Sequence, residues 1–451
     1  MNIGGPLMKK LLRSEDPEQL RLFAGLCRDK LDEFDRSLEL YRRVLNLQAN
    51  THGFEHEEMA ATYFCIGLVL GALGDIDESL LNLLKALAIQ ESFLGLEHVE
   101  VADSYVEIGH MLTKRGDYSG AYTQYQRALV IREEQHGKGH FLVIKSLQDI
   151  GLVLQKKGDF EESEIEYRKA LSIQEDVLSD CHQDLATTHA LIGVLLFKRG
   201  DYKQSQWHHK KSLRIRESML GKDDEECAIS HGYLGEVLSR RGDYKGAVKE
   251  LKRAQEIREA NVGMTNSVTA GSYLDLGHIY CRNGKYVEAL AQYRKAKVIR
   301  ESILGPNHPD TALTYMCVGD ALNLDGDPEA ALTNHRKALV VFESVLGENH
   351  PRTAAGYQSI ADALLANGNT DLALAEHRKA LKIRIGFLTK DHPDTAESCS
   401  RIGELLLHKK DLTGALSLYR QALTITIVRC GNDHPESAIA RVDVARVLTA
   451  L

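Results

Sequence analysis

The feature that most constrains the fold of this 451-residue chain is a spacing of 42 residues that recurs along nearly its whole length. When the sequence is written in rows of 42, small residues align in columns. The clearest column contains Gly25, Gly67, Gly109, Gly151, Gly193, Gly235, Gly277, Gly319, Ala361 and Gly403. No insertion disturbs this register. A fixed period of this length predicts one structural element pair per repeat, with each repeat stacked on the next.

Residues 102–136 show what one repeat is expected to form. Apolar residues between 102 and 112 recur at helical spacing, which predicts a first helix. Gly116 is placed to end that helix, because glycine adopts a left-handed backbone without strain. Asp117 follows as the expected N-cap of a second helix, where its carboxylate can accept free backbone N–H groups. The second helix is expected to pack with one side, which carries Ala121, Tyr125, Ala128, Leu129 and Ile131.

One such helix pair cannot bury both of its faces alone, whereas stacked pairs share a continuous core, so the chain is predicted to be an all-α solenoid. Residues 1–16 are expected to be a lead segment, 17–435 the repeat array and 436–451 a C-terminal capping helix. The expected repeats lie at about 17–58, 59–100, 101–142, 143–184, 185–226, 227–268, 269–310, 311–352, 353–394 and 395–435.

The columns resemble the tetratricopeptide repeat (TPR). The residues that match its spacing of aromatic, Leu-Gly, Tyr, Ala, aromatic and Ala positions are Tyr63, Ile66, Gly67, Leu70, Ser79, Leu83 and Ala86. Each repeat is eight residues longer than the usual 34, and the extra residues form a linker after the second helix. Repeats of this length resemble those of kinesin light chains and nephrocystin-like proteins over roughly residues 17–450. The resemblance implies a right-handed superhelix of about ten TPR helix-turn-helix units.

A histidine recurs in the linker, as in LGPNHPDTA at 304–312. The column contains His56, His98, His140, His182, Asp224, Asn266, His308, His350, His392 and His434. A shared metal site is disfavoured, because packed helices lie roughly 8–10 Å apart and zinc needs its ligands within about 2.0–2.3 Å. Second ligands within a linker, His136 or Cys430, do not recur. Asp224 and Asn266 are good N-cap residues, so the histidine is predicted to cap the next helix.

No motif for catalysis or for a cofactor is found in the sequence. The glycines stand singly at helix ends, and neither a phosphate-binding loop nor a Gly-x-Ser-x-Gly elbow is present. Cys281 and His278 could be reactive in principle, but both occupy repeat columns that hold ordinary residues elsewhere. The expectation is a protein without catalytic residues, cofactor or metal.

Charge and cysteine usage bear on location and partner class. The 56 basic and 64 acidic residues give a net charge of −8, which predicts no general attraction to nucleic acid or to an anionic membrane. The start of the sequence lacks a signal-peptide pattern, and Leu80–Ile89, the densest apolar run, is too short to span a bilayer. The eight cysteines never form Cys-x-x-Cys, which is typical of reduced thiols. These features predict a cytoplasmic protein without membrane insertion.

Basic residues recur on the second helices and allow two interpretations. They could form a stripe for phosphate or for acidic partners, or they could be solvated positions balanced by acids on the same helices. We favour the second interpretation because mixed charges are normal on exposed helix faces. The residues are Arg168, Lys169, Lys210, Lys211, Lys252, Arg253, Arg294, Lys295, Arg336, Lys337, Arg378, Lys379 and Arg420.

TPR superhelices resemble one another in lining a concave groove with their first helices. The position after the column glycine should face that groove, and it is acidic mainly in the carboxyl half of the chain. Such a groove would orient an extended basic peptide, although exposed solenoid faces need polar residues even without a ligand. The candidate partner-binding residues are His110, Glu236, Asp275, His278, Asp320, Asp362 and Glu404.

The kinesin light chain comparison has two departures. That family carries a coiled coil before its repeats, whereas the repeats here begin near residue 17. The resemblance also implies a row of asparagines in the cargo groove, but none of the matching positions here is asparagine. These positions hold Glu107, Asp149, Leu191, Tyr233, Asp275, Cys317, Ser359 and Arg401.

The leading hypothesis is a non-enzymatic scaffold or adaptor that binds proteins or extended peptides, basic ones in particular, on the concave TPR surface. One alternative is a kinesin-light-chain-like cargo adaptor with a kinesin heavy chain as partner, which would add a cytoskeletal association. The other is the repeat portion of a larger signalling protein.

Overall fold

The structure is a computed structural model that describes residues 16–30, 33–52, 56–177, 182–387, 392–430, 432 and 435–450. All regular secondary structure in these residues is α-helical, and the chain divides into an N-terminal unit, Met1–Lys222, and a C-terminal unit, Asp223–Leu451.

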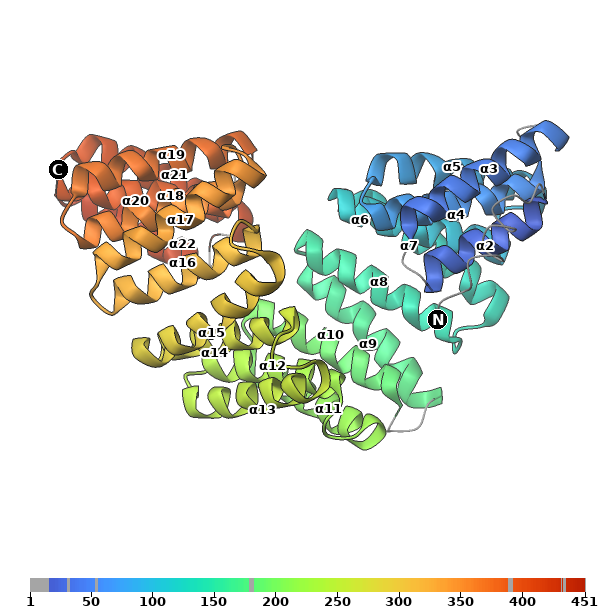
Figure 1. Ribbon diagram of the computed structural model, residues 1–451, viewed down its shortest axis with the longest axis horizontal. Helices are drawn as coiled ribbons and strands as arrows, with labels where there is room; N and C mark the ends of the chain where they lie inside the picture. The colour runs from blue at the N-terminus through green and yellow to red at the C-terminus, as the bar shows by residue number, and fades with distance from the viewer. Residues whose placement is uncertain are drawn as a thin grey trace. The chain divides into compact units, whose positions relative to one another are not determined.

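Among the described residues, the N-terminal unit contains five helix pairs. They are α2 (Pro17–Lys30) with α3 (Phe34–His52), α4 (Glu57–Leu73) with α5 (Ile76–Leu94), α6 (Val99–Arg115) with α7 (Tyr118–His136), α8 (Phe141–Lys157) with α9 (Phe160–Val177), and α10 (Gln183–Arg199) with α11 (Tyr202–Leu220). Within this unit each helix packs against the helices before and after it (Figure 1).

The described part of the C-terminal unit contains five pairs and one further helix. They are α12 (Glu225–Arg240) with α13 (Tyr244–Val262), α14 (Ser267–Arg282) with α15 (Tyr286–Leu304), α16 (Pro309–Leu324) with α17 (Pro328–Leu346), α18 (Pro351–Ala366) with α19 (Thr370–Phe387), α20 (Pro393–His408) with α21 (Leu412–Cys430), and the last helix α22 (Pro435–Leu448). The helices pack in the same serial order. The predicted all-α repeat array is confirmed; the right-handed sense of the superhelix stays a prediction.

The column glycine brings the two helices of a pair into close contact. At Gly109 an added Cβ would lie only 2.6 Å from the Tyr125 ring, and at Gly277 it would overlap the ring of Tyr293. Both tyrosines are buried. The small residue of the second helix completes the contact, as when the Ser79 hydroxyl donates to the Gly67 carbonyl at 2.6 Å. Because a methyl group does not fit here, the sequence period follows from packing.

The linker histidines cap the first helices. His308 has an extended backbone (φ −84°, ψ 140°), and its Nδ1 accepts a hydrogen bond from the Asp310 N–H at 3.1 Å. The same contact is formed at His56, His98, His140, His182, His350 and His392. Asp224 and Asn266 form it with a side-chain oxygen. The predicted capping role is therefore confirmed at these positions, while His434 lies outside the described residues.

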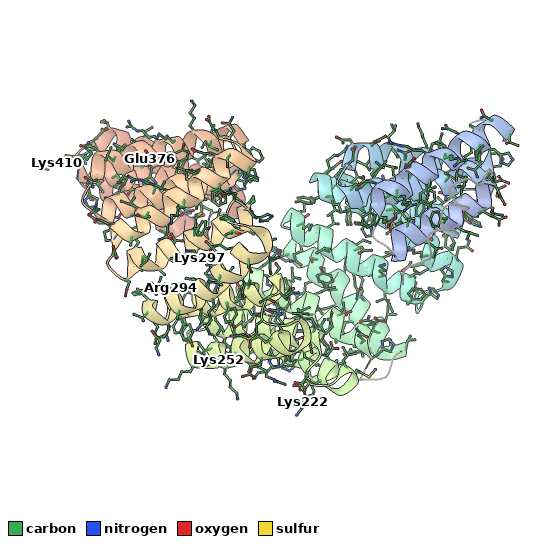
Figure 2. All side chains as sticks on the ribbon, viewed as in Figure 1. Lys222, Lys252, Arg294, Lys297, Glu376 and Lys410 are labelled. Atoms are coloured by element: carbon green, nitrogen blue, oxygen red, sulfur yellow. The ribbon has the colours of Figure 1, made fainter. Side chains whose placement is uncertain are left out.

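The turn within a pair uses a left-handed residue. Gly116 has φ +89° and ψ 5°, and Asp117 then accepts a hydrogen bond from the Gly120 N–H at 3.0 Å, as predicted. Lys410 occupies the same column in the last pair and adopts φ +64°, the only positive φ of a non-glycine residue in the described part of the chain (Figure 2). A side chain in this region is strained, so Lys410 shows that the turn geometry is imposed by the packing around it.

The recurring basic residues of the second helices are solvated. Lys252 and Arg294 extend away from the ribbon in Figure 2, and both are exposed. Both interpretations require exposed side chains, so the one that we favour for this stripe stays a prediction.

A second column, which sequence analysis did not identify, joins successive pairs. The residue four positions after the second small residue of a second helix, for example Arg132 after Ala128, meets a hydroxyl residue 14 positions later in the next first helix. We call this the clamp column. Its hydrogen-bonded pairs, at 2.5–3.0 Å, are Gln48–Thr62, Gln90–Ser104, Arg132–Ser146, Gln174–Thr188, Arg258–Ser272, Arg300–Thr314 and Arg384–Ser398.

The clamp changes chemistry where the column loses its polar residues. Phe342 takes the place of the arginine between α17 and α18, and its partner position is Gly356. A Cβ at Gly356 would lie 3.6 Å from the Phe342 ring, so the aromatic side chain fills the space that a hydroxyl side chain and a guanidinium fill elsewhere. Thr426 and Ala440 occupy the two positions between α21 and α22.

Replacing Gly277 by alanine should destabilise the chain by about 1–3 kcal/mol, because the new methyl group overpacks against the Tyr293 ring. Gly271 in the same helix is the matched control, since an added Cβ meets nothing within 4 Å there. Gly271→Ala should raise stability by up to about 1 kcal/mol through helix propensity. Urea unfolding of the full chain measures both changes, and equal effects of the two variants would contradict the packing argument.

Replacing Arg132 by methionine should lower the free energy of unfolding by about 1–3 kcal/mol, because the Ser146 hydroxyl loses its buried partner. Arg132 is only 4% exposed. The control is Arg115→Met, which removes an exposed ion pair with Asp77 (3.7 Å) and should change stability by less than about 1 kcal/mol. Urea denaturation measures the free energy of unfolding of both variants. Equal losses in the two variants would contradict a stabilising role for the clamp.

Candidate partner-binding surface

The predicted binding residues all lie on first helices. These helices approach each other directly from pair to pair: α4 and α6, α8 and α10, α12 and α14, α14 and α16, and α16 and α18. No two successive second helices are as close among the described helices. Side chains of successive first helices therefore lie near enough to form shared clusters.

His110 forms a charged cluster in the N-terminal unit. Its Nδ1 lies 3.4 Å from Glu107 Oε2, and its Nε2 lies 3.8 Å from Asp149 Oδ2 on α8. The ring also packs edge-on against Tyr125, with centroids 5.6 Å apart. Burial opposes a charge on the imidazole, but the carboxylates of Asp149 and Glu107 outweigh it and raise the pKa of His110 to about 9. His110 is therefore a cation at neutral pH, held between two acids.

Glu236, Asp275 and His278 line one cavity of about 450 Å³ between α12 and α14 in the C-terminal unit. Arg258 and Arg282 line the same cavity, as does Tyr233. Burial raises the pKa of Asp275; Arg258 opposes this shift and Glu236 adds to it. The charges of the two arginines offset those of the two carboxylates. This part of the surface is therefore less acidic than the sequence positions after the column glycine predict.

His278 also contacts the next first helix. Its Nε2 lies 3.6 Å from the Cys317 Sγ on α16. Burial raises the pKa of Cys317 to about 12, so this cysteine remains a thiol that can donate to the ring, and burial together with Arg282 lowers the pKa of His278. Burial raises the pKa of the Cys281 thiol as well. Neither cysteine has the lowered pKa of a reactive thiol.

Asp320 and Asp362 are carboxylates on adjacent first helices, α16 and α18, and each lies beside a buried histidine of its own pair. Asp320 Oδ1 lies 3.5 Å from His335 Nε2, and Asp362 Oδ1 lies 3.4 Å from His377 Nε2. The Asp320 side chain is 56% exposed, with protein around its remaining sides. Partial desolvation and the charge of Asp362 raise the pKa of Asp320 to about 7, although a hydrogen bond with Ser359 lowers it in part.

The histidine below Asp320 is neutral. Burial lowers the pKa of His335 to about 4, so it supplies no positive charge to Asp320 at neutral pH. Glu404 continues the series as an exposed residue on α20. We call Asp320, Asp362 and Glu404 the acidic row. The structure thus brings Asp320 near Asp362, and Glu236 near Asp275 and His278, while His110 forms its own cluster in the other unit.

Sequence analysis missed the groups that modify these charges. Asp149 and Glu107 were named only among the positions that match the kinesin light chain asparagines, not as partners of His110. Arg258 was not predicted to lie near the groove. Reading pairs of columns 14 residues apart would have found the clamp arginines, because each is followed at that distance by serine or threonine.

Two further findings concern the described residues as a whole. None of their helices is long and apolar enough to cross a membrane. No group of three or more His, Cys, Asp or Glu side chains in the described ranges is arranged to hold a metal ion.

The pKa of His110 can be tested by NMR titration of its ring protons, with an expected midpoint near pH 9. Since this value lies above the roughly 6.5 of an unperturbed histidine, the stability gained from the charged ring is fully present below about pH 6.5 and is lost as the pH rises through about 9. Asp149→Asn should move the midpoint down. His278 is the internal contrast, because its pKa is lowered. A His110 midpoint at or below 6.5 would contradict the cluster.

Comparison with known proteins supports the repeat assignment. The family model for the tetratricopeptide repeat matches residues 19–92, 100–176, 184–260, 310–386 and 357–425, and a second tetratricopeptide repeat model matches 269–310. No curated protein matches the sequence.

Solved structures are similar in fold. The apo form of the quorum sensor NprR from B. thuringiensis gives a TM-score of 0.55 at 14% identity, covering 79% of this chain and 98% of that chain. BtubC (BKLC) from P. vanneervenii gives 0.43 at 18% identity, covering 51% and 91%. The nearly identical TPR-like repeats of a Podosopora anserina protein described as a kinesin light chain give a TM-score of 0.41 at 18% identity, covering 46% and 97%.

The matched repeats span most of the sequence, and the helix pairs, the glycine contacts and the capped linkers follow the same period in the structure. The chain belongs to the tetratricopeptide repeat family.

Proposed function

We propose that this protein is a non-enzymatic interaction scaffold whose C-terminal unit binds an extended basic segment of a partner protein along its first helices. Tetratricopeptide repeats generally serve as interaction scaffolds, and the family matched here is a repeat family. The specific partner class is inferred from the charges of the first helices.

The observation that carries this proposal is the proximity of Asp320 and Asp362. Two carboxylates on adjacent helices repel each other, and this repulsion contributes to the raised pKa of Asp320. The buried histidine beside Asp320 is neutral and does not relieve it. A lysine or arginine of a partner placed between the two acids would remove the repulsion, so the free protein favours a cationic ligand at this point.

The surface before the acidic row suits a less charged part of the same segment. The cavity between α12 and α14 combines Tyr233 and Ile229 with two acids and two arginines. A tyrosine beside balanced charges offers apolar area and hydrogen bonds to a bound segment, and the segment needs no net charge at this place. The charge of the first-helix surface changes from balanced near α12 to acidic near α16–α20, and this difference would orient the bound segment.

A fluorescent lysine-rich peptide should bind the full chain more tightly than a glutamate-rich peptide of equal length. Asp320→Asn and Asp362→Asn should each weaken the basic peptide about threefold to tenfold, with a loss of salt dependence. Binding should also strengthen as the pH rises from 6 to 8, because Asp320 ionises with a pKa near 7. Fluorescence anisotropy measures all three effects.

The matched control is Glu256→Gln, which removes one exposed carboxylate from a second helix and should leave peptide binding unchanged. In Asp320→Asn the pH dependence between 6 and 8 should disappear. Indifference to peptide charge, or equal losses in the control and the groove variants, would remove the proposal.

The kinesin-light-chain-like adaptor rests on sequence resemblance alone, and the repeat portion of a larger signalling protein is the other alternative. Co-purification of a kinesin heavy chain with the tagged protein would favour the first of these over a general scaffold. We propose a cytoplasmic location, which imaging of the tagged protein would test, together with any association with the cytoskeleton.

A further inference from the structure

The clamp column is interrupted once in a way that leaves space. Between α21 and α22 its two positions are Thr426 and Ala440, in place of arginine and serine. The Thr426 hydroxyl donates to the Ala422 carbonyl of its own helix at 2.8 Å instead of reaching α22. No side chain of the clamp therefore joins these two helices.

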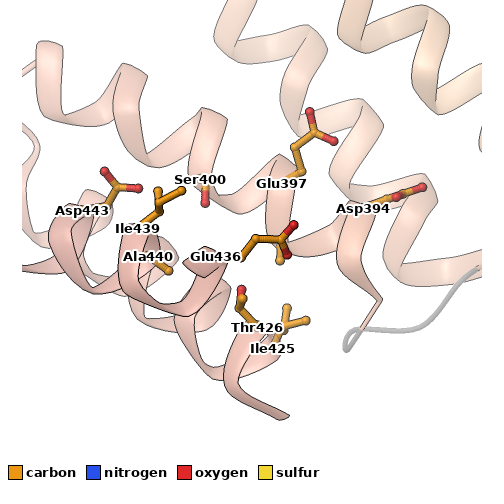
Figure 3. Close-up of a pocket in the computed structure, with 10 residues that line it drawn as sticks. Asp394, Glu397, Ser400, Ile425, Thr426, Glu436, Ile439, Ala440 and Asp443 are labelled. Atoms are coloured by element: carbon orange, nitrogen blue, oxygen red, sulfur yellow. The ribbon is translucent and has the colours of Figure 1, made fainter. Parts of the chain in front are cut away.

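A cavity of about 440 Å³ lies at this position, between α20, α21 and α22. Four carboxylates and two hydroxyls line it: Asp394, Glu397, Glu436, Asp443, Ser400 and Thr426. In Figure 3 Ser400 and Thr426 face the space into which Glu436 reaches, and Asp443 and Glu397 lie at its sides. We call this cavity the C-terminal acidic pocket. Its volume is in the range of small-ligand sites.

Other repeats of the chain show what fills this place. The Arg132 guanidinium donates from Nη1 to the Ser146 hydroxyl at 2.8 Å and to the Leu142 carbonyl at 3.3 Å, and its Nη2 pairs with Asp103 at 2.8 Å. Arg384 donates in the same way to the Ser398 hydroxyl (2.5 Å) and the Asp394 carbonyl (3.0 Å). Both arginines are buried. The fold thus already binds guanidinium groups at the repeat-equivalent place.

Acidic residues that face a clamp arginine in other repeats have acidic equivalents in the last repeat, where the arginine itself is absent. Seven periods of 42 residues relate Asp103 to Glu397 and Arg132 to Thr426. One period relates Asp394, which faces Arg384, to Glu436. Asp443 and Ser400 add polar groups to this set. The C-terminal acidic pocket therefore keeps counter-charges of a clamp arginine while lacking the arginine itself.

The pocket carboxylates have polar neighbours, yet no basic side chain lines the pocket among the residues that the structure describes. The contacts are Gln358 Nε2 to Glu397 Oε1 (3.1 Å), Arg401 Nη2 to Glu397 Oε1 (3.9 Å), Arg446 Nη1 to Asp443 Oδ1 (3.4 Å) and His392 Nδ1 to Asp394 Oδ1 (3.8 Å). A carboxylate can accept several hydrogen bonds at once. These contacts therefore leave capacity for donors from a ligand.

We propose that the C-terminal acidic pocket binds the guanidinium of an arginine side chain supplied by a partner protein, which takes the place of the missing clamp arginine. This inference rests on the proposed function for the class of partner and adds a specific anchor for it. Arginine is favoured over lysine because its planar fork of five N–H donors can bridge carboxylates and hydroxyls on three helices together.

The test uses the full chain labelled at isoleucine δ1-methyl groups, because Ile425 and Ile439 line the pocket. The probe is N-acetyl-arginine amide, compared with N-acetyl-lysine amide and N-acetyl-norleucine amide. Arginine amide should shift both methyl signals saturably, with a dissociation constant on the order of a millimolar. Lysine amide should bind at least about threefold more weakly, and norleucine amide should produce no shift.

The decisive variant is Thr426→Arg/Ala440→Ser, which restores the internal clamp. It should abolish the response to arginine amide while leaving the thermal midpoint unchanged or higher. Glu397→Gln and Asp443→Asn should each weaken the response about threefold or more, and they support the inference even where the clamp variant folds poorly. Asp371→Asn, an exposed carboxylate on α19, is the matched control and should have no effect.

The proposal is overturned if the folded clamp variant still responds to arginine amide, if norleucine amide shifts the same signals, or if the Glu397 and Asp443 variants behave as the control does. These measurements use a single arginine and report the pocket alone. The peptide experiment with the acidic row reports the proposed function, so either can fail while the other succeeds.

Discussion

The whole array depends on the contact between a glycine of one helix and a large side chain of the next. Where Gly109, Gly151 or Gly277 faces a buried tyrosine, there is no room for even one methyl group. This contact sets the spacing within these pairs, and a similar spacing in the other pairs lets linkers of equal length join one pair to the next. Because a similar spacing recurs in each pair, side chains 14 residues apart meet across each junction and side chains 42 residues apart occupy equivalent places on neighbouring pairs, which is the basis of both the clamp column and the charged clusters.

The fold could be predicted from the sequence because its determinants are local and repeated. Gly116 with Asp117, and His308 with Pro309, mark helix ends through backbone preferences that require no knowledge of distant contacts. Ten copies of one pattern also average out the ambiguity of any single segment. The helix pairs therefore followed directly from the spacing, and the family followed from the resemblance of the columns to the tetratricopeptide pattern.

The candidate surface was predictable in position but less so in charge. The residue after the column glycine was expected on the first-helix face, and Asp320 and Asp362 do lie on adjacent first helices. The contribution of Arg258 to the cavity between α12 and α14 was missed, since an arginine on a second helix reaches that cavity only through the three-dimensional packing of the pairs. The protonation of His110 was missed for the same reason, because Asp149 comes from the following repeat.

The linker histidines have one consequence for the array as a whole. Each of them stabilises the helix that follows it through an Nδ1 that accepts a backbone N–H two residues ahead. One residue type performs this role at seven described junctions. Because each cap forms entirely within its own junction, loss of one histidine weakens the start of one helix and leaves the caps at the other junctions in place.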